Sequence, residues 1–160
     1  MTKAAVKILI TSALMVLGLN VVKAQAPSFD DKTSKADEVN IIIKSKNYVF
    51  EDEHTPIPGE HYNMKVSANS VMTKLPEKDK AGANTDNTIQ FTSTDFTYNC
   101  TPGKNGGWDV TIVPNGNITS ANRDIKKLYL HINPMGYASL NIKTDRDMAS
   151  YSGYIKQRGY

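Results

Sequence analysis

The fold of this chain is indicated most clearly by residues 128–142, which read LYLHINPMGYASLNI. Apolar residues occupy every second position on both sides of Asn133-Pro134-Met135-Gly136, and polar or aromatic residues fill the positions between them. A period of two is typical of a strand with one buried face, and a run containing Asn, Pro and Gly is typical of a tight turn. This stretch therefore predicts an antiparallel hairpin.

The same alternation recurs along most of the chain. A Gly-rich turn over 102–107 predicts a second hairpin, and the polar stretches 77–87 and 114–124 are expected to be loops. Sequential strands joined by short turns usually pair, so we expect an antiparallel meander of seven to nine short strands. Besides the first hairpin, the segments expected to form strands include 48–51, 62–68, 89–92, 96–101, 108–113 and 149–155.

Residues 30–46 break the alternation and predict one N-terminal helix. Val39, Ile42 and Ile43 recur there at spacings of three and four, acidic residues come first and lysines come last. The predicted fold class is therefore mainly β, with one helix. Such a sheet must protect its edges. Three arrangements are open: a barrel with lipocalin-like closure, a two-sheet sandwich, or a curved sheet that holds the helix.

The first 24 residues, MTKAAVKILITSALMVLGLNVVKA, have the layout of a secretory signal peptide. Two lysines precede an apolar run over 8–22, which is shorter than the roughly 20 residues that a spanning helix needs. We predict a signal peptide over 1–24, a linker over 25–34 and a single strand-rich domain over 35–160. The expected location is the periplasm or the cell exterior.

Charge and cysteine content exclude several kinds of partner. Three of the 19 basic residues lie in the leader, which leaves 16 against 16 acidic residues and a net charge of zero. A neutral domain lacks the basic surface expected for nucleic acid or anionic membrane. Cys100 is the single cysteine, so an intrachain disulfide cannot form. No cysteine follows the apolar run, so we expect no lipid anchor after signal cleavage.

Candidate catalytic and metal-binding groups are few. Acids and histidines gather over 51–61, but their spacing matches no ligand motif, so a solvated turn is favoured and no metal or cofactor is expected. Residues 145–147 with Arg123 and Asp124 suggest a calcium or carbohydrate loop, yet the EF-hand spacing is absent and a surface turn is favoured. No nucleophile motif accompanies His131, so we expect a non-enzyme, with a hydrolase as the least favoured alternative.

The candidate ligand-binding residues are Tyr129, His131, Tyr137 and Tyr154. Their positions in the alternation place them on the solvent side of strands. A tyrosine ring combines an apolar face with a polar tip, which suits sugar or peptide ligands, although packing within the sheet is the alternative. We expect a small apolar or glycan-type ligand in the cell envelope. The alternative is a structural or interaction module that binds an envelope protein through an exposed strand edge.

The second half of the chain also resembles a known family. Its marker residues are Tyr98, Gly107-Trp108, Leu128–Ile132, Gly136–Ile142, Arg146 and Tyr151–Ile155. Together with the leader and helix, this series resembles secreted Bacteroidetes proteins called the domain of unknown function 4251 family, over residues 35–156. One departure is Glu77–Lys80, where members carry an aromatic, glycine-containing stretch after the Leu-Pro pair. The resemblance implies no catalytic residues, because the family has no established activity.

Overall fold

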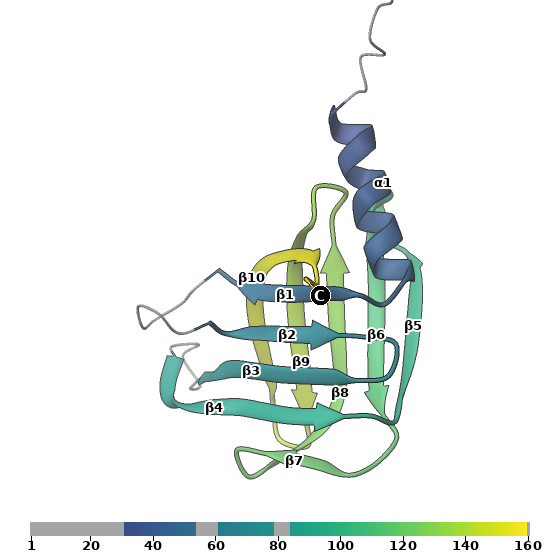
Figure 1. Cartoon of the computed structure of the whole chain (residues 1–160). Coiled ribbons are helices and arrows are strands. Elements are labelled where there is room, and N and C mark those ends of the chain that lie inside the picture. Colours follow the sequence, from purple (N-terminus) through teal and green to yellow (C-terminus); the bar gives the residue numbers. More distant parts are fainter. Residues whose placement is uncertain (1–30, 54–60, 79–83, 160) are drawn as a thin grey trace, which may run out of the picture.

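The structure is a computed structural model that describes residues 31–53, 61–78 and 84–159. Within these ranges the chain forms ten antiparallel strands in one curled half-barrel sheet, together with one α-helix (Figure 1). The predicted mainly β class with an N-terminal helix is confirmed, but the described ranges hold ten strands where seven to nine were predicted, because short strands at the rim lack the apolar alternation. The predicted signal peptide over 1–24 lies outside the described residues.

The two hairpins predicted from local signals are present as β5–β6 and β8–β9. A short 3-10 turn, η1, spans Lys104–Gly106 between the first two of these strands. In chain order the elements are α1 Asp31–Lys44, β1 Tyr48–Asp52, β2 Asn63–Val66, β3 Val71–Lys78, β4 Asn84–Ser93, β5 Phe96–Pro102, β6 Trp108–Pro114, β7 Ile118–Ser120, β8 Arg123–Ile132, β9 Tyr137–Thr144 and β10 Met148–Gln157.

The two predicted loops, 77–87 and 114–124, were wrong in part. Strand β3 extends to Lys78, β4 begins at Asn84, and the short strand β7 lies inside the second segment. Backbone hydrogen bonds to a neighbouring strand define these elements. Backbone pairing at the rim of a sheet does not require apolar side chains. The alternation of apolar and polar residues that is typical of a half-buried strand is therefore absent from these segments.

The order of strands explains how the sheet curls. The order is β4-β3-β2-β1-β10-β9-β8-β6-β5, and β7 pairs with β8. The first and last strands are therefore hydrogen-bonded to each other, and the seam of the half-barrel falls between β4 and β5. In Figure 1, β1 to β4 run across the strands behind them. The two crossing layers meet where β1 pairs with β10.

Gly153 lies at this meeting point, opposite Asp52 of β1 and Ala138 of β9. A Cβ atom there would overlap the carbonyl oxygen of Glu51 and lie 2.9 Å from its carbonyl carbon and 3.0 Å from Cζ of Phe50. Glycine in a strand often marks a tight bend where two backbones approach. The close approach of β1 and β10 therefore depends on the missing side chain.

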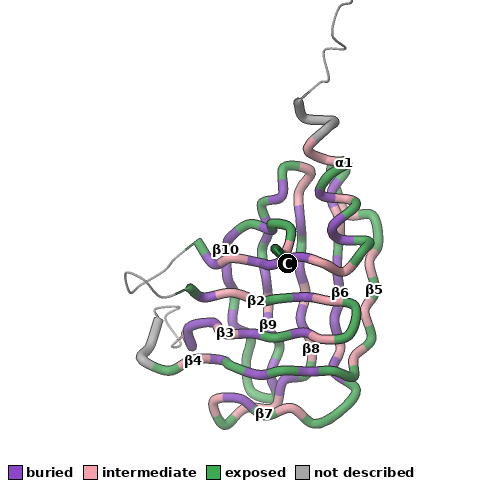
Figure 2. Tube along the Cα trace, in the orientation of Figure 1, coloured by how far each residue is buried: buried purple, intermediate pink, exposed green. Residues whose placement is uncertain are grey.

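The concave face of the sheet and α1 enclose the core. Figure 2 shows buried and exposed residues alternating along the strands. Val39, Ile42 and Ile43 of α1 are buried, as predicted. The helix ends with Lys46 in the left-handed region (φ 53°), while the amides of Lys46 and Asn47 donate to Ile43 and Ile42. This is the Schellman arrangement, which satisfies the last carbonyls of a helix.

Side-chain hydrogen bonds tie the two ends of the seam. Near α1, the Tyr98 hydroxyl of β5 donates to the carbonyl of Ile43 (3.1 Å) and lies 3.3 Å from the Tyr48 hydroxyl of β1. At the other end, Ser120 Oγ of β7 accepts from the amide of Gln90 (2.8 Å) and donates to its carbonyl (3.0 Å). The β7 segment is thereby bound to the edge strand β4, and the candidate site opens beside it.

Candidate functional site

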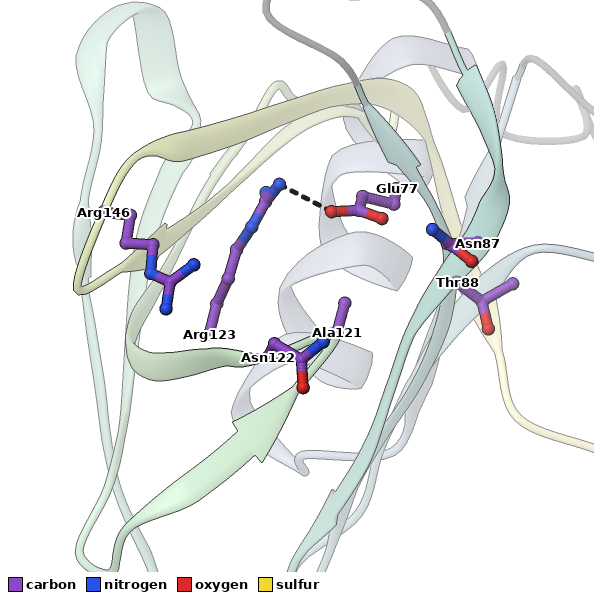
Figure 3. Close-up of a pocket in the computed structure, with 7 residues that line it drawn as sticks. All are labelled: Glu77, Asn87, Thr88, Ala121, Asn122, Arg123 and Arg146. Atoms are coloured by element: carbon purple, nitrogen blue, oxygen red, sulfur yellow. Dashed lines mark ion pairs between the residues drawn. The ribbon is translucent and has the colours of Figure 1, made fainter.

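A polar pocket of about 500 Å³ opens at the end of the half-barrel away from α1, and we call it the rim pocket (Figure 3). Strand β3, strand β4, the β7–β8 turn and the β9–β10 turn all contribute to its wall. Charged, amide and hydroxyl side chains dominate the wall. The lining residues are Glu77, Asn87, Thr88, Ala121, Asn122, Arg123 and Arg146.

An ion pair between Glu77 and Arg123 is the central feature of this pocket. Arg123 Nη2 lies 2.5 Å from Glu77 Oε1, and the two side chains are only 19% and 11% exposed. Arg123 Nη1 also lies 3.1 Å from Asp147 Oδ2. In Figure 3 the second oxygen of Glu77 points away from Arg123. The desolvation of two largely buried charges offsets much of their attraction, so the pair itself adds little net stability.

Two register irregularities flank the rim pocket. Pairing between β3 and β4 shifts between Pro76 and Lys78, so extra residues of β4, including Asn87, lie opposite Glu77. Pairing between β8 and β9 shifts between Ile125 and Lys127. Bulges are over-represented at barrel rims and beside functional sites, where they redirect side chains. The irregular pairing therefore shapes the wall that carries the polar groups.

The β7–β8 turn adds local backbone strain to the wall. Ala121 (φ 53°) and Asn122 (φ 59°) both adopt the left-handed region between the paired residues Ser120 and Arg123. A two-residue hairpin turn with both central φ values positive favours Asn and Gly, and alanine is costly in that conformation. The contact of Ser120 with β4 helps to hold this strained turn at the pocket.

Tyr151 lies close to the charged groups of the rim pocket, which include Glu77 and Arg123. Its hydroxyl donates to the carbonyl of Pro76 (2.8 Å), and Lys78 Nζ lies 4.9 Å from the centre of its ring. Burial raises the pKa of Tyr151, and the carboxylates of Asp52 and Glu77 add to the shift. Tyr151 therefore stays a neutral hydrogen-bond donor, and it anchors the end of β3 that carries Glu77.

The predicted tyrosines lie on the outer face, away from the rim pocket. Tyr137 and Tyr154 are directly opposite each other on β9 and β10, and both are exposed. With Met135, Lys35 and Glu53 they line a hollow of about 440 Å³, which we call the tyrosine shelf. The structure thus brings together two of the four predicted ligand-binding residues.

Tyr129 and His131 are on the same outer face but do not line the tyrosine shelf. Lys127 Nζ lies 5.3 Å from the centre of the Tyr129 ring. His131 Nδ1 lies 2.6 Å from Asp109 Oδ1 on β6, and Ser139 of β9 is its neighbour in register. This row has the residue types of a hydrolase triad, but His131 and Asp109 are about half exposed on an open sheet surface. Hydrolysis by such a triad also needs hydrogen-bond donors that stabilise an oxyanion. The backbone amides near His131 are already paired within the sheet.

The described ranges hold neither a cluster of metal-ligating side chains nor a helix that could span a membrane. No group of three or more His, Cys, Asp or Glu residues that could hold a metal ion occurs among them. No helix in those ranges is long and apolar enough to span a bilayer. Part of the acidic and histidine cluster over 51–61, including His54 and Glu60, lies outside the described residues.

Sequence reasoning located the rim pocket only in part. It grouped Arg123 with residues 145–147, and the structure places Arg123 and Arg146 on one pocket wall. It favoured a surface turn, whereas these residues form a turn that also lines a pocket. It missed Glu77, which it assigned to a polar loop. The sequence signal that could have pointed to Glu77 was its position directly after the apolar Leu75-Pro76 pair.

Comparisons with known proteins give no family assignment. No protein-family model matches this chain, and no curated protein matches it.

Proposed function

We propose that this chain is an exported, non-catalytic binding domain that holds a small glycan-type ligand in the rim pocket. The observation that carries the proposal is the Glu77–Arg123 ion pair, which is nearly buried and yet borders a polar pocket of about 500 Å³. Ligand sites combine a concave wall with a few fixed polar groups, and barrel mouths are a common place for them. Export is supported by the leader-like pattern of residues 1–24.

The lining favours a glycan-type ligand over a small apolar one. Arginine and amide groups donate hydrogen bonds, while carboxylate, amide and hydroxyl oxygens accept them. A sugar presents hydroxyl groups that do both. The concave face of the sheet is occupied by large buried side chains, which include Tyr48, Phe50, Met64 and Tyr151. An apolar ligand therefore finds little unfilled apolar surface in the described part of the barrel.

The lining also favours binding over catalysis. Of the seven described residues that line it, none is a histidine or cysteine, the side chains that most readily transfer protons or attack as nucleophiles near neutral pH. The Glu77 carboxylate is already engaged in an ion pair with Arg123. These groups are suited to recognise a ligand and hold it.

The test is a ligand-observed NMR screen of the purified protein against mono- and disaccharides. We expect saturation transfer to at least one sugar and its loss in Asn87→Trp, where the indole fills the pocket. Asn99→Trp, at an exposed site on β5, is the matched control and keeps binding. If no sugar binds, the proposal fails. If Tyr137→Ala abolishes binding and Asn87→Trp does not, the ligand occupies the tyrosine shelf and the rim-pocket assignment fails.

A second candidate function is an envelope-protein interaction module. Among the strands that the structure describes, β5 pairs only with β6, and none of its residues is buried. An unpaired strand edge can add a strand from another chain. Stoichiometric co-purification of an envelope protein that is lost in Asn99→Pro, with sugar binding unaffected, would favour this function over the first.

A further inference from the structure

Arg146 is the charged group of the rim pocket that is left available for a ligand. Its Nε atom forms an ion pair with Asp145 Oδ2 at 3.7 Å, a contact longer than a hydrogen bond, and its side chain is 65% exposed. The described part of the chain gives its guanidinium no hydrogen bond. In Figure 3 this guanidinium is turned toward Arg123. Arg123, in contrast, is already engaged by Glu77 and Asp147.

The backbone that carries Arg146 is held in place. The amides of Arg146 and Asp147 donate to Thr144 Oγ1 at 3.1 and 3.0 Å. The amide of Asp145 donates to the carbonyl of Asp124, and Asp145 Oδ1 accepts from the amide of Asp124. The β9–β10 turn is thus fixed within itself and to β8. Binding must therefore order side chains of the pocket but not the backbone of this turn, which limits the entropic cost.

The charges facing Arg146 leave room for an anion. The described residues of the lining include two arginines and one glutamate. Three carboxylates lie close to the arginines: Asp147 is paired with Arg123, Asp124 is paired with Lys126, and Asp145 is paired with Arg146 at 3.7 Å. Among the described residues, an anion at Arg146 therefore competes only with the long contact to Asp145. A guanidinium presents a planar fork that binds carboxylate or phosphate through two parallel hydrogen bonds.

We propose that the ligand of the rim pocket is an acidic sugar, whose oxyanion is bound by Arg146 while its hydroxyl groups bind Glu77, Asn87 and Asn122. This inference rests on the proposed function, because it names the class of sugar that the same pocket takes. Carboxylate and phosphate share the chemistry that Arg146 recognises. Sugar acids and sugar phosphates are therefore separate arms of the test.

The experiment is isothermal titration of the purified protein with glucuronate, glucose 6-phosphate and glucose. We expect one anionic probe to bind about ten- to hundredfold more tightly than glucose, as charge-assisted hydrogen bonds imply. Arg146→Gln is expected to reduce that affinity to the level of glucose. Arg146→Lys keeps the positive charge but loses the planar fork of the guanidinium. Its affinity for the anionic probe is expected to lie between that of the parent protein and that of Arg146→Gln. Lys143→Gln removes an exposed cation elsewhere on β9 and leaves affinity unchanged.

The outcomes separate this inference from the proposed function. Equal binding of glucose and both anionic probes, with Arg146→Gln neutral, overturns the acidic-sugar inference and leaves sugar binding intact. An equal loss in Lys143→Gln and Arg146→Gln also overturns it, because the effect is then one of overall charge. Absence of binding by any sugar in the wider NMR screen overturns the proposed function itself.

Discussion

Replacing Gly153 by alanine tests whether the contact between β1 and β10 sets the curl of the sheet. The added Cβ would overlap the Glu51 carbonyl oxygen and meet two carbon atoms at 2.9 and 3.0 Å, where ordinary contacts are 3.4–4 Å. The carbon contacts alone require a shift of about half an ångström. Two of the three atoms belong to the β1 backbone, which is paired on both sides and cannot rotate away.

Overpacking a well-filled interior costs about 1–3 kcal/mol, and more where backbone must move. We therefore expect Gly153→Ala to lower the free energy of unfolding by about 3 kcal/mol, which corresponds to a fall in Tm of roughly 10 °C for a chain of this size. The assay is urea unfolding followed by tyrosine and Trp108 fluorescence, with the midpoint compared at constant m-value.

Gly116→Ala is the matched control, because a Cβ there meets nothing within 4 Å. Its free energy of unfolding is expected to stay within about 0.5 kcal/mol of the parent's, as for other surface changes. A Gly153→Ala protein as stable as this control would refute the reasoning. It would mean that β1 and β10 can separate without loss, and that the curl has another cause.

Three further predictions concern the seam, the strained turn and the buried hydroxyls. Ala121→Gly is expected to raise the free energy of unfolding by about 0.5–1 kcal/mol, because glycine adopts φ 53° without strain; an unchanged urea midpoint would contradict this. Tyr98→Phe removes the hydroxyl that contacts Ile43 and Tyr48 and should cost about 1–2 kcal/mol in the same assay, whereas Tyr137→Phe should cost little. Burial raises the pKa of Tyr48, Tyr98 and Tyr151 above the usual 10.0, so their contribution to stability is complete below pH 10. It is lost as pH rises above 10, where the unfolded chain ionises and the folded chain does not, at about 1.4 kcal/mol per pH unit for each tyrosine; a flat stability between pH 9 and pH 11 would show that these hydroxyls are not buried.

The local parts of the fold were predictable from the sequence, because local residues encode them. The alternation of apolar residues around Asn133–Gly136 was sufficient to predict the β8–β9 hairpin. The spacing of Val39, Ile42 and Ile43 was sufficient to predict the helix and its buried side. The pairing of β1 with β10 was not predictable in this way. It joins residues from opposite ends of the domain, and no turn between them marks the register.

The candidate site was predictable to the extent that its residues are neighbours in sequence or in a hairpin. Arg123 and residues 145–147 could be grouped because the strands that carry them pair. Glu77 could not be added, since its position depends on the long-range curl that brings β3 opposite the β7–β8 turn. Alternation correctly assigned Tyr137 and Tyr154 as exposed, whereas Tyr129 is only partly exposed. Alternation alone cannot say which of the tyrosines share a hollow.

The rim pocket is a consequence of where the seam falls. A meander whose first and last strands pair leaves its opening between two consecutive strands, here β4 and β5. Strand β7 reaches β4 through Ser120 but does not form a backbone ladder with it. The backbone beside this junction is bulged or left-handed, so the wall carries side chains that a regular ladder would direct elsewhere. A ligand that contacts both Asn87 of β4 and Asn122 of the β7–β8 turn would join the two sides of the junction, and binding there would stabilise the weakest link in the closure of the sheet.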